Sequence, residues 1–147
     1  SGSIISMSSV AGVTGGLGPH AYAAAKHAVV GITRNLAAEV CAFGVRVNCI
    51  APYSVATPMV AQAYLDDHTD IDSTLKMLTD ESPLSGRPGL ADDVANAVLW
   101  LASDESGYTS GHTLTIDAGI TTGSMAGPPR FSEKAPLMRE AGKRGVE

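Results

Sequence analysis

Tyr22 and Lys26 lie four residues apart, and Ser9 precedes the tyrosine by thirteen residues. Residues at positions i and i+4 share one face of a helix, so the phenol and the ammonium can point into the same cleft. A phenol with a pKa of about 10 is a poor acid or base at neutral pH, but a neighbouring cation favours the phenolate and lowers that pKa. The spacing therefore predicts a proton-transfer pair, with the Ser9 hydroxyl placed to hold a substrate oxygen beside it.

The same pair also arises by chance on solvated helix faces, so its context decides between the two interpretations. Here an apolar strand at about residues 3–8 and two serines lead into a glycine-rich turn, and a helix of small residues follows at about 21–42. The thirteen-residue spacing selects Ser9 rather than Ser8 as the partner of the tyrosine. Alternation along a strand would also turn Ser8 to the opposite side.

Four stretches of the chain resemble the short-chain dehydrogenase/reductase family, in the family's order and at its spacing. They are Gly2-Ser-Ile-Ile-Ser-Met-Ser-Ser-Val-Ala-Gly12, Tyr22-Ala-Ala-Ala-Lys26, Val45-Arg-Val-Asn-Cys-Ile-Ala-Pro52 and Ser110-Gly-His-Thr-Leu-Thr-Ile-Asp117. The resemblance covers residues 2–123. Within the family, Pro52-Tyr-Ser-Val-Ala-Thr-Pro58 looks most like the secoisolariciresinol and xanthoxin dehydrogenase group. Most relatives carry glycine where this chain has Tyr53, a departure that supports the subgroup.

The resemblance implies a role for each member of the trio. Tyr22 would be the general acid/base on the alcohol or carbonyl oxygen, Lys26 would lower the tyrosine pKa and bind the nicotinamide ribose, and Ser9 would orient the substrate oxygen. The implied cofactor is NAD, with NADP as the alternative, and the residues implied to bind it are Tyr22, Lys26, Pro52, Val55 and Thr57. A plainer interpretation makes Val55 loop packing and Thr57 the cap of a helix that begins at Pro58.

Strands alternate with helices along the chain, which predicts an α/β fold with a parallel sheet and right-handed crossovers. The expected strands lie at about 3–8, 45–50 and 114–116, the expected long helices at 21–42 and 92–103, and one or two short helices in a flap at 53–82. On the long helix the apolar positions at helical spacing are Ala25, Val29, Ile32 and Leu36, and Gly44 follows as a left-handed stop. Ligands in such sheets bind outside the carboxyl ends of the strands, so Ser9 and residues 52–57 should face one crevice.

No glycine-rich phosphate loop stands on a first strand, and no acidic residue ends a second one. Residues 1–123 are therefore expected to be the C-terminal half of a doubly wound, Rossmann-type dinucleotide-binding domain, inactive without the other half. Thr14-Gly-Gly-Leu-Gly18 imitates such a loop, but its glycine spacing is wrong and Pro19 interrupts it, so a turn is expected. Residues 124–147 are expected to form an extension, either solvated or a subunit-contact arm.

Composition limits the functional classes. The chain has 147 residues, 44% of them hydrophobic, and a net charge of −5, which suits a globular domain and no nucleic-acid partner. No apolar run reaches the roughly 20 residues of a membrane span. Cys41 and Cys49 lack disulfide or metal-ligand patterns and are expected to be buried, reduced thiols, which suits a cytoplasmic location.

The remaining polar and aromatic candidates carry weaker signals. His20 either lines the substrate pocket or is a loop histidine without a role, and the other histidines have no ligand-like spacing. No metal site is expected, because the cluster of acidic residues in the flap is interpreted as a solvated rim; its members are Asp66, Asp67, Asp70 and Asp72. Trp100 and Leu101 are expected in the core.

Two functions remain open at this point. The first is an NAD(P)-dependent oxidoreductase that acts on a secondary alcohol or ketone, apolar or cyclic because the segment at 59–65 is mainly apolar. The second is a catalytically silent relative that serves as a binding or assembly module, which the intact Ser9, Tyr22 and Lys26 argue against. Because related enzymes use the small-residue helix in oligomers, a homodimer or homotetramer is expected.

Overall fold

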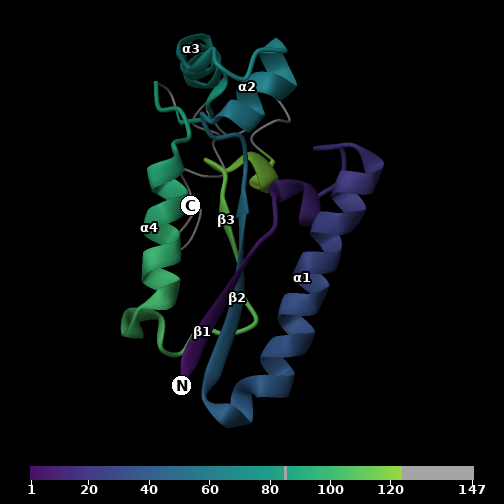
Figure 1. Cartoon of the computed structure of the whole chain (residues 1–147), viewed down its shortest axis with the longest axis vertical. Helices are drawn as coiled ribbons and strands as arrows, with labels where there is room; N and C mark the ends of the chain where they lie inside the picture. The colour runs from purple at the N-terminus through teal and green to yellow at the C-terminus, as the bar shows by residue number, and fades with distance from the viewer. Residues whose placement is uncertain (85, 124–147) are drawn as a thin grey trace, which may run out of the picture.

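Three parallel strands form the centre of the computed structural model, which describes residues 1–84 and 86–123. They are β1 (Gly2–Met7), β2 (Val45–Pro52) and β3 (Thr113–Ile116), and they pair in the order β1-β2-β3 (Figure 1). The predicted parallel α/β sheet is confirmed. The expectation for the extension at 124–147 lies outside the described residues.

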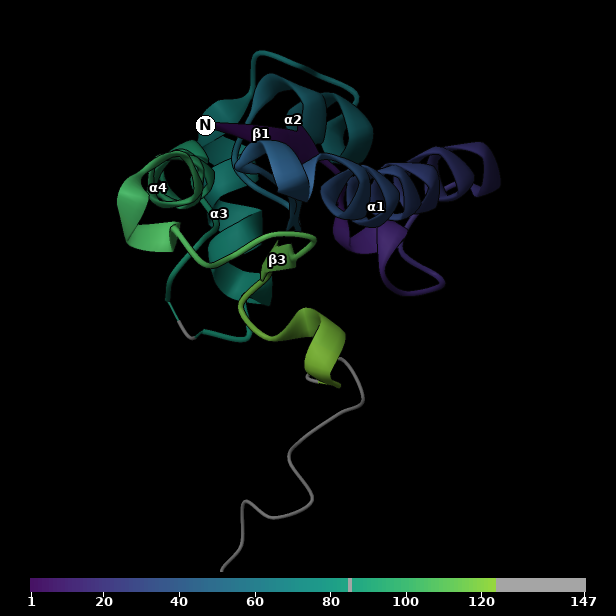
Figure 2. The ribbon, with the colours of Figure 1, turned by 90° about the horizontal axis from the view of Figure 1, so that it is seen from below.

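Helices α1 (His20–Val40) and α4 (Ala91–Ala102) cover opposite faces of the sheet in both views (Figure 1, Figure 2). The strands follow one another across the sheet in chain order, so the β1–β2 and β2–β3 connections step in the same direction. When one of them passes over one face and the other over the opposite face, one crossover is right-handed and the other is left-handed. The expectation of right-handed crossovers is therefore wrong for one of the two. The second connection first builds α2 (Pro58–Leu65) and α3 (Ile71–Glu81) at the carboxyl end of the sheet, which lets α4 return along the far face.

The central strand β2 forms most of the buried core. It pairs with β1 from Gly2↔Val45 to Met7↔Ile50 and with β3 from Cys49↔Thr113 to Pro52↔Ile116. With a neighbour on each side and a helix on each face, its residues Val47, Asn48, Cys49, Ile50 and Ala51 are almost fully buried. Parallel strands covered on both faces are mainly apolar rather than alternating; the one polar member here, Asn48, donates to the Thr109 oxygen at 2.8 Å and accepts the His112 N–H at 3.0 Å.

The face of α1 that packs on the sheet differs from the predicted one. The buried positions are Val30, Thr33 and Ala37, whereas Ile32, expected on the buried face, is 63% exposed. Val29 and Leu36 of the predicted face are half-buried, so the helix is rotated by about one residue, and the small side chains around it allow this rotation. After α1 a short turn at Cys41–Phe43 ends at Gly44 with φ 67°, which confirms the predicted left-handed stop.

Two side chains expected inside lie at the surface. Cys41 is exposed at the turn after α1, whereas Cys49 on β2 is fully buried, and both are free thiols. Trp100 is 38% exposed, although its neighbour Leu101 is fully buried. Successive residues on a helix are separated by about 100° around its axis, so a helix that buries Leu101 against a sheet turns Trp100 outward. Within 1–84 and 86–123, no helix has the length and apolar character needed to cross a membrane.

Arg46 on β2 binds the carboxyl end of α4 through hydrogen bonds. Its guanidinium donates to the carbonyl oxygens of Leu101 at 2.9 Å and Ser103 at 3.0 Å, and to the Ser106 hydroxyl at 2.8 Å. The Ser3 hydroxyl, opposite Arg46 on β1, donates to the same Leu101 oxygen at 2.8 Å. The last carbonyls of a helix lack partners within the helix and attract positive charge, so these donors hold α4 in place.

Candidate active site

The two serines after β1 make different contacts. The Ser8 hydroxyl donates to the backbone oxygen of Lys26 at 2.9 Å. The Ser9 hydroxyl, also buried, accepts a hydrogen bond from the Ala11 N–H at 3.2 Å and caps the short turn Val10–Gly12. A hydroxyl has one proton to donate, and Ser8 has already given its own to the helix. Within residues 1–84 and 86–123 the Ser9 hydroxyl donates to no partner, so its proton remains available, which separates the two serines on chemical grounds.

Helix α1 comes close to the turn after β1 because Gly12 has no side chain. A Cβ at Gly12 would lie 2.6 Å from the backbone oxygen of Lys26 and would clash with the Ser8 hydroxyl. The Lys26 ammonium in turn donates to the Met7 carbonyl oxygen at 3.1 Å. Two hydrogen bonds at Lys26 therefore join the end of the strand to the helix, one to the Lys26 backbone oxygen and one from its ammonium.

Tyr22 lies one helical turn before Lys26, and its ring stands 5.5 Å from the ammonium nitrogen, measured to the ring centre. The side chain is 40% exposed. A Cβ built on Gly18 would lie 3.1 Å from the Tyr22 ring and 3.3 Å from the Ala11 methyl, so ring and turn are close neighbours. Tyr22 and Ser9 thus flank the same turn at the carboxyl end of β1, and Lys26, one helical turn beyond Tyr22, binds the end of the strand. All three predicted residues belong to a single strand–turn–helix unit.

The loop after β2 is anchored at two backbone positions. The Tyr53 N–H donates to the Ile116 oxygen of β3 at 3.0 Å, and the Ala56 N–H donates to the Gly89 oxygen at 2.9 Å. Between these anchors, the Val55 N–H donates no hydrogen bond within the described part of the chain. An unpaired N–H on a loop held at both sides is suited to meet a polar group of a ligand.

Thr57 is the cap of α2. Its hydroxyl accepts a long hydrogen bond from the Val60 N–H at 3.5 Å and donates to the Val55 oxygen at 3.2 Å, and Pro58 begins the helix. The structure therefore shows the capping role that the sequence left open. To bind a phosphate as a donor, the hydroxyl would have to turn away from Val55. Pro52, the last residue of β2, pairs with Ile116 at the same edge of the sheet.

A pocket of about 500 Å³ opens beside this loop. The loop itself, the end of α3 and the end of β3 line it, with Tyr53, Val55, Leu78, Glu81 and Ile116 among the lining residues. Burial raises the pKa of the Tyr53 phenol, and the neighbouring Tyr64 and Glu81 raise it further. Tyr53 therefore stays protonated and does not compete for the role predicted for Tyr22, which lies outside this pocket together with Ser9 and Lys26.

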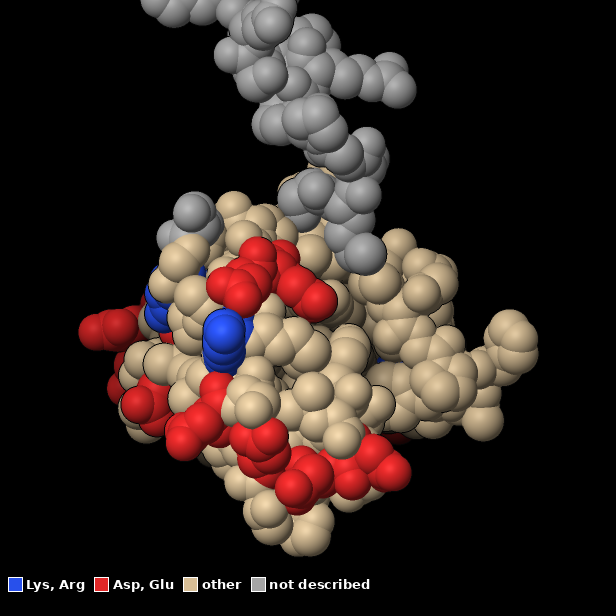
Figure 3. Space-filling model, turned by 90° about the horizontal axis from the view of Figure 1, so that it is seen from above, with Lys and Arg blue, Asp and Glu red and all other residues tan. Residues whose placement is uncertain are grey.

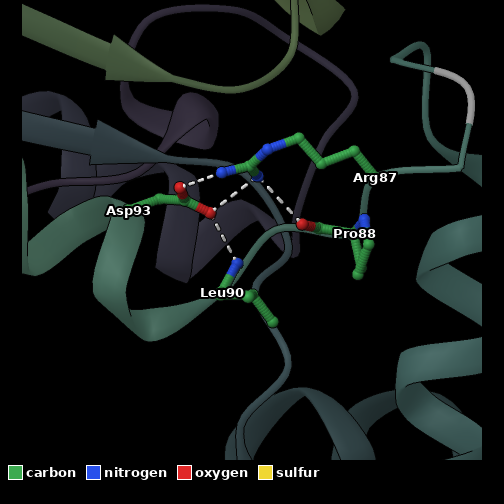
Figure 4. A network of polar contacts seen from close by, with 4 residues as sticks. All are labelled: Arg87, Pro88, Leu90 and Asp93. Atoms are coloured by element: carbon green, nitrogen blue, oxygen red, sulfur yellow. Dashed lines mark hydrogen bonds and ion pairs between the residues drawn. The ribbon is translucent and has the colours of Figure 1, made fainter.

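Sequence reasoning missed a polar cluster on the segment that meets the loop. The Arg87 guanidinium grips the Asp93 carboxylate with both of its terminal nitrogens, and Asp93 also accepts the Leu90 N–H (Figure 4). The hydrogen bonds from Arg87 and from Leu90 hold the pKa of Asp93 below its usual value. A signal was present: an arginine, a Pro-Gly pair and an acidic residue in the first turn of the next helix.

Carboxylates dominate the charge at the end of the molecule formed by α2 and α3 (Figure 3). Residues 58–81 contain six acidic residues and one lysine; the acidic ones are Asp66, Asp67, Asp70, Asp72, Asp80 and Glu81. Asp70 caps α3 by accepting the Ser73 N–H at 3.0 Å, and Asp66 and Asp67 are exposed, as expected for a solvated rim. Nowhere in the described ranges do three or more His, Cys, Asp or Glu side chains gather as metal ligands would. His20 is exposed at the first position of α1.

Residues 1–121 match the family model described as enoyl-(acyl carrier protein) reductase. A (+)-borneol dehydrogenase of Salvia officinalis is 49% identical over 129 residues, which cover 85% of this chain and 45% of the relative. Xanthoxin dehydrogenase of Arabidopsis thaliana is 48% identical over 124 residues, which cover 82% of this chain and 43% of the relative. The chain belongs to the short-chain dehydrogenase/reductase family of oxidoreductases, close to the xanthoxin and secoisolariciresinol dehydrogenases.

Solved structures show the same doubly wound fold. A 3-oxoacyl-[acyl-carrier protein] reductase from Brucella melitensis with bound NAD superimposes with a TM-score of 0.61 at 35% identity, over 80% of this chain and 40% of that one. A candidate 2-deoxy-d-gluconate 3-dehydrogenase from Agrobacterium tumefaciens with bound NADP gives 0.66 at 33% identity, over 83% and 47%. The chain spans less than half the length of the relatives it matches. These neighbours support a nicotinamide cofactor, and they include both forms.

The close approach at Gly12 generates a prediction. Gly12→Ala should lower the free energy of unfolding of the purified protein by about 1–3 kcal/mol, because the new methyl forces α1 away from the turn that carries Ser9. Gly15→Ala in the same connection is the matched control, since a Cβ there meets nothing within 4 Å. Denaturant unfolding of both variants measures the difference. Equal stability of the two variants would show that the helix does not depend on this contact.

Proposed function

We propose that this chain supplies the catalytic half of an NAD(P)-dependent oxidoreductase that interconverts a secondary alcohol and a ketone. The observation that carries the proposal is the strand–turn–helix unit that contains Ser9, Tyr22 and Lys26, with the Lys26 ammonium 5.5 Å from the centre of the Tyr22 ring. Residues 1–123 would form the C-terminal part of the dinucleotide-binding domain. NAD is the proposed form of the cofactor, because the chain lies close to the xanthoxin dehydrogenase group and that subgroup resemblance favours NAD.

Each side chain of the trio has a part in proton transfer. In alcohol oxidation, the Tyr22 phenolate accepts the proton of the substrate hydroxyl. The carbon that bears this hydroxyl loses a hydride to the nicotinamide, which leaves the ketone, and reduction runs the same steps in reverse. The Lys26 ammonium, one turn away, stabilises the phenolate. The Ser9 hydroxyl keeps its proton and donates a hydrogen bond to the substrate oxygen, where negative charge develops in the transition state. When bound, the nicotinamide supplies the hydride acceptor or donor.

The loop after β2 fits the carboxamide end of a nicotinamide. The Val55 N–H is unpaired within the described residues and lies between two backbone anchors, so it can donate to a carboxamide oxygen without rearrangement of the loop. Lys26 would also reach a ribose hydroxyl, exchanging its bond to the Met7 oxygen. Thr57 is the weakest member of the proposed cofactor set, because its hydroxyl is already engaged with Val55.

The exposed side chains of helix α2 favour an uncharged, apolar substrate. Ala61 packs inward and is fully buried, whereas Met59 and Tyr64 are 75% and 53% exposed and give this helix an apolar outer surface. The acidic end of the molecule lies next to it (Figure 3). Anionic substrates are repelled by such a surface, and burying an unpaired charge against apolar side chains is costly.

Replacing the proposed acid/base tests the chemistry. In the complete enzyme, Tyr22→Phe should lower kcat by at least about 100-fold, the low end for loss of a general acid/base. NADH binding, measured by fluorescence titration, should remain, because the ring and its packing are kept. Turnover within threefold of the wild-type rate would exclude Tyr22 from this role.

The substrate class is tested by comparing kcat/KM for cyclic secondary alcohols, steroid alcohols, sugar alcohols and hydroxy acids with NAD as cofactor. The apolar alcohols should be preferred over the hydroxy acids by at least about tenfold, the scale expected for burial of an unmatched group. A preference for sugar alcohols or hydroxy acids would refute the apolar-pocket proposal while leaving the reaction type intact.

A homo-oligomer is also proposed, because the outer face of α1 carries small and apolar residues at helical spacing: Ala24, Ala28, Gly31 and Ile32, all exposed. Light scattering of the complete protein at micromolar concentration should give the mass of a dimer or tetramer. Ile32→Arg, which places a charge in the middle of this face, should shift the mass toward the monomer. A monomeric wild-type protein would contradict this arrangement.

A further inference from the structure

The segment between α3 and α4 is folded around one arginine. Arg87 binds Asp93 through both terminal nitrogens, at 3.0 Å and 2.5 Å, and the first of these nitrogens also donates to the Pro88 oxygen at 3.1 Å (Figure 4). Asp93 accepts the Leu90 N–H at 2.9 Å, so the same carboxylate holds both the arginine and the start of α4. The residues from Arg87 to Asp93 thus form a closed loop, termed here the arginine clamp.

The arginine clamp meets the loop after β2, backbone against backbone. Gly89, in the middle of the clamp, accepts the hydrogen bond from the Ala56 N–H at 2.9 Å. A Cβ at Gly89 would lie 2.7 Å from the Ser54 oxygen and 3.2 Å from a methyl of Val55, so no side chain separates the two segments. A displacement of the clamp is therefore transmitted directly to the residues on either side of Val55.

We propose that Arg87 and Asp93 are positioning residues for cofactor binding: through Gly89 they set the orientation of the loop that offers the Val55 N–H to the nicotinamide carboxamide. This inference rests on the proposed function. Neither residue needs to touch the cofactor. Their effect passes through one backbone hydrogen bond and one close packing contact.

The exposure of the ion pair separates this role from a purely structural one. The side chains of Arg87 and Asp93 are 55% and 22% exposed, so solvent screens the pair, and its loss together with the cap at Leu90 should lower stability only modestly. Removal of the clamp should therefore leave the protein folded and change the geometry of one loop. The change should appear in cofactor affinity and in the KM for NAD more than in thermal stability.

The experiment measures the Kd for NADH by fluorescence titration, and the KM for NAD against kcat, in the complete enzyme. Arg87→Ala and Asp93→Asn should each weaken NADH binding by about fivefold or more, the scale of losing one hydrogen bond at the site. Arg87→Lys should recover only part of the affinity, because an ammonium cannot make the two-pronged contact. The double variant should bind NADH as tightly as the single variant with the higher Kd, because the two residues act as one unit.

Asp92→Asn is the matched control: it makes the same chemical change one residue earlier in the first turn of α4, where the structure shows no side-chain partner within the described residues. It should bind NADH like the wild type. If Arg87→Ala and Asp93→Asn bind within twofold of the control, or if their lost affinity is matched by lost folded protein in thermal unfolding, the positioning role is overturned. A wild-type enzyme that binds neither NADH nor NADPH would instead overturn the proposed function itself.

Discussion

The close contact between α1 and the turn after β1 is the constraint on which the candidate site depends. Gly12 lets the helix backbone approach, the Ser8 hydroxyl binds the Lys26 oxygen, and the Lys26 ammonium returns to the Met7 oxygen. These contacts use the hydroxyl proton of Ser8, whereas within the described residues the hydroxyl proton of Ser9 has no acceptor. They also hold the turn that carries Ser9 against the helix that carries Tyr22, so the proposed site depends on packing at one strand–helix junction.

The loop after β2, which is proposed to bind the cofactor, is held in place differently. The loop after β2 has no core of its own, and it is held by two backbone hydrogen bonds to elements that come later in the chain, β3 and the segment containing Gly89. A loop held in this way takes its geometry from its supports. Preorganised donors of this kind act without rearrangement when a ligand binds, which is how binding loops on rigid scaffolds work.

The sequence predicted what is local and missed what is long-range. The helix carrying Tyr22 and Lys26, the stop at Gly44 and the cap at Thr57 follow from short patterns, and the structure has all of them. The buried face of α1 and the exposure of Trp100 depend on which face meets the sheet, and alanine-rich or uniformly apolar helices do not encode that choice clearly. The hydrogen bond from Ala56 to Gly89 joins residues 33 positions apart, and no local pattern in the sequence predicts it.

Whether Tyr22 and Lys26 act as one proton-transfer unit can be decided by a double-variant cycle on the two residues. The measurement is kcat at saturating NAD and alcohol for Tyr22→Phe, Lys26→Met and the double variant of the complete enzyme. If the lysine works through the phenol, the double variant should turn over no more slowly than the slower single variant, as residues that act together do. If the fold-losses in kcat of the two single variants multiply in the double variant, the two side chains contribute independently and do not act as one unit.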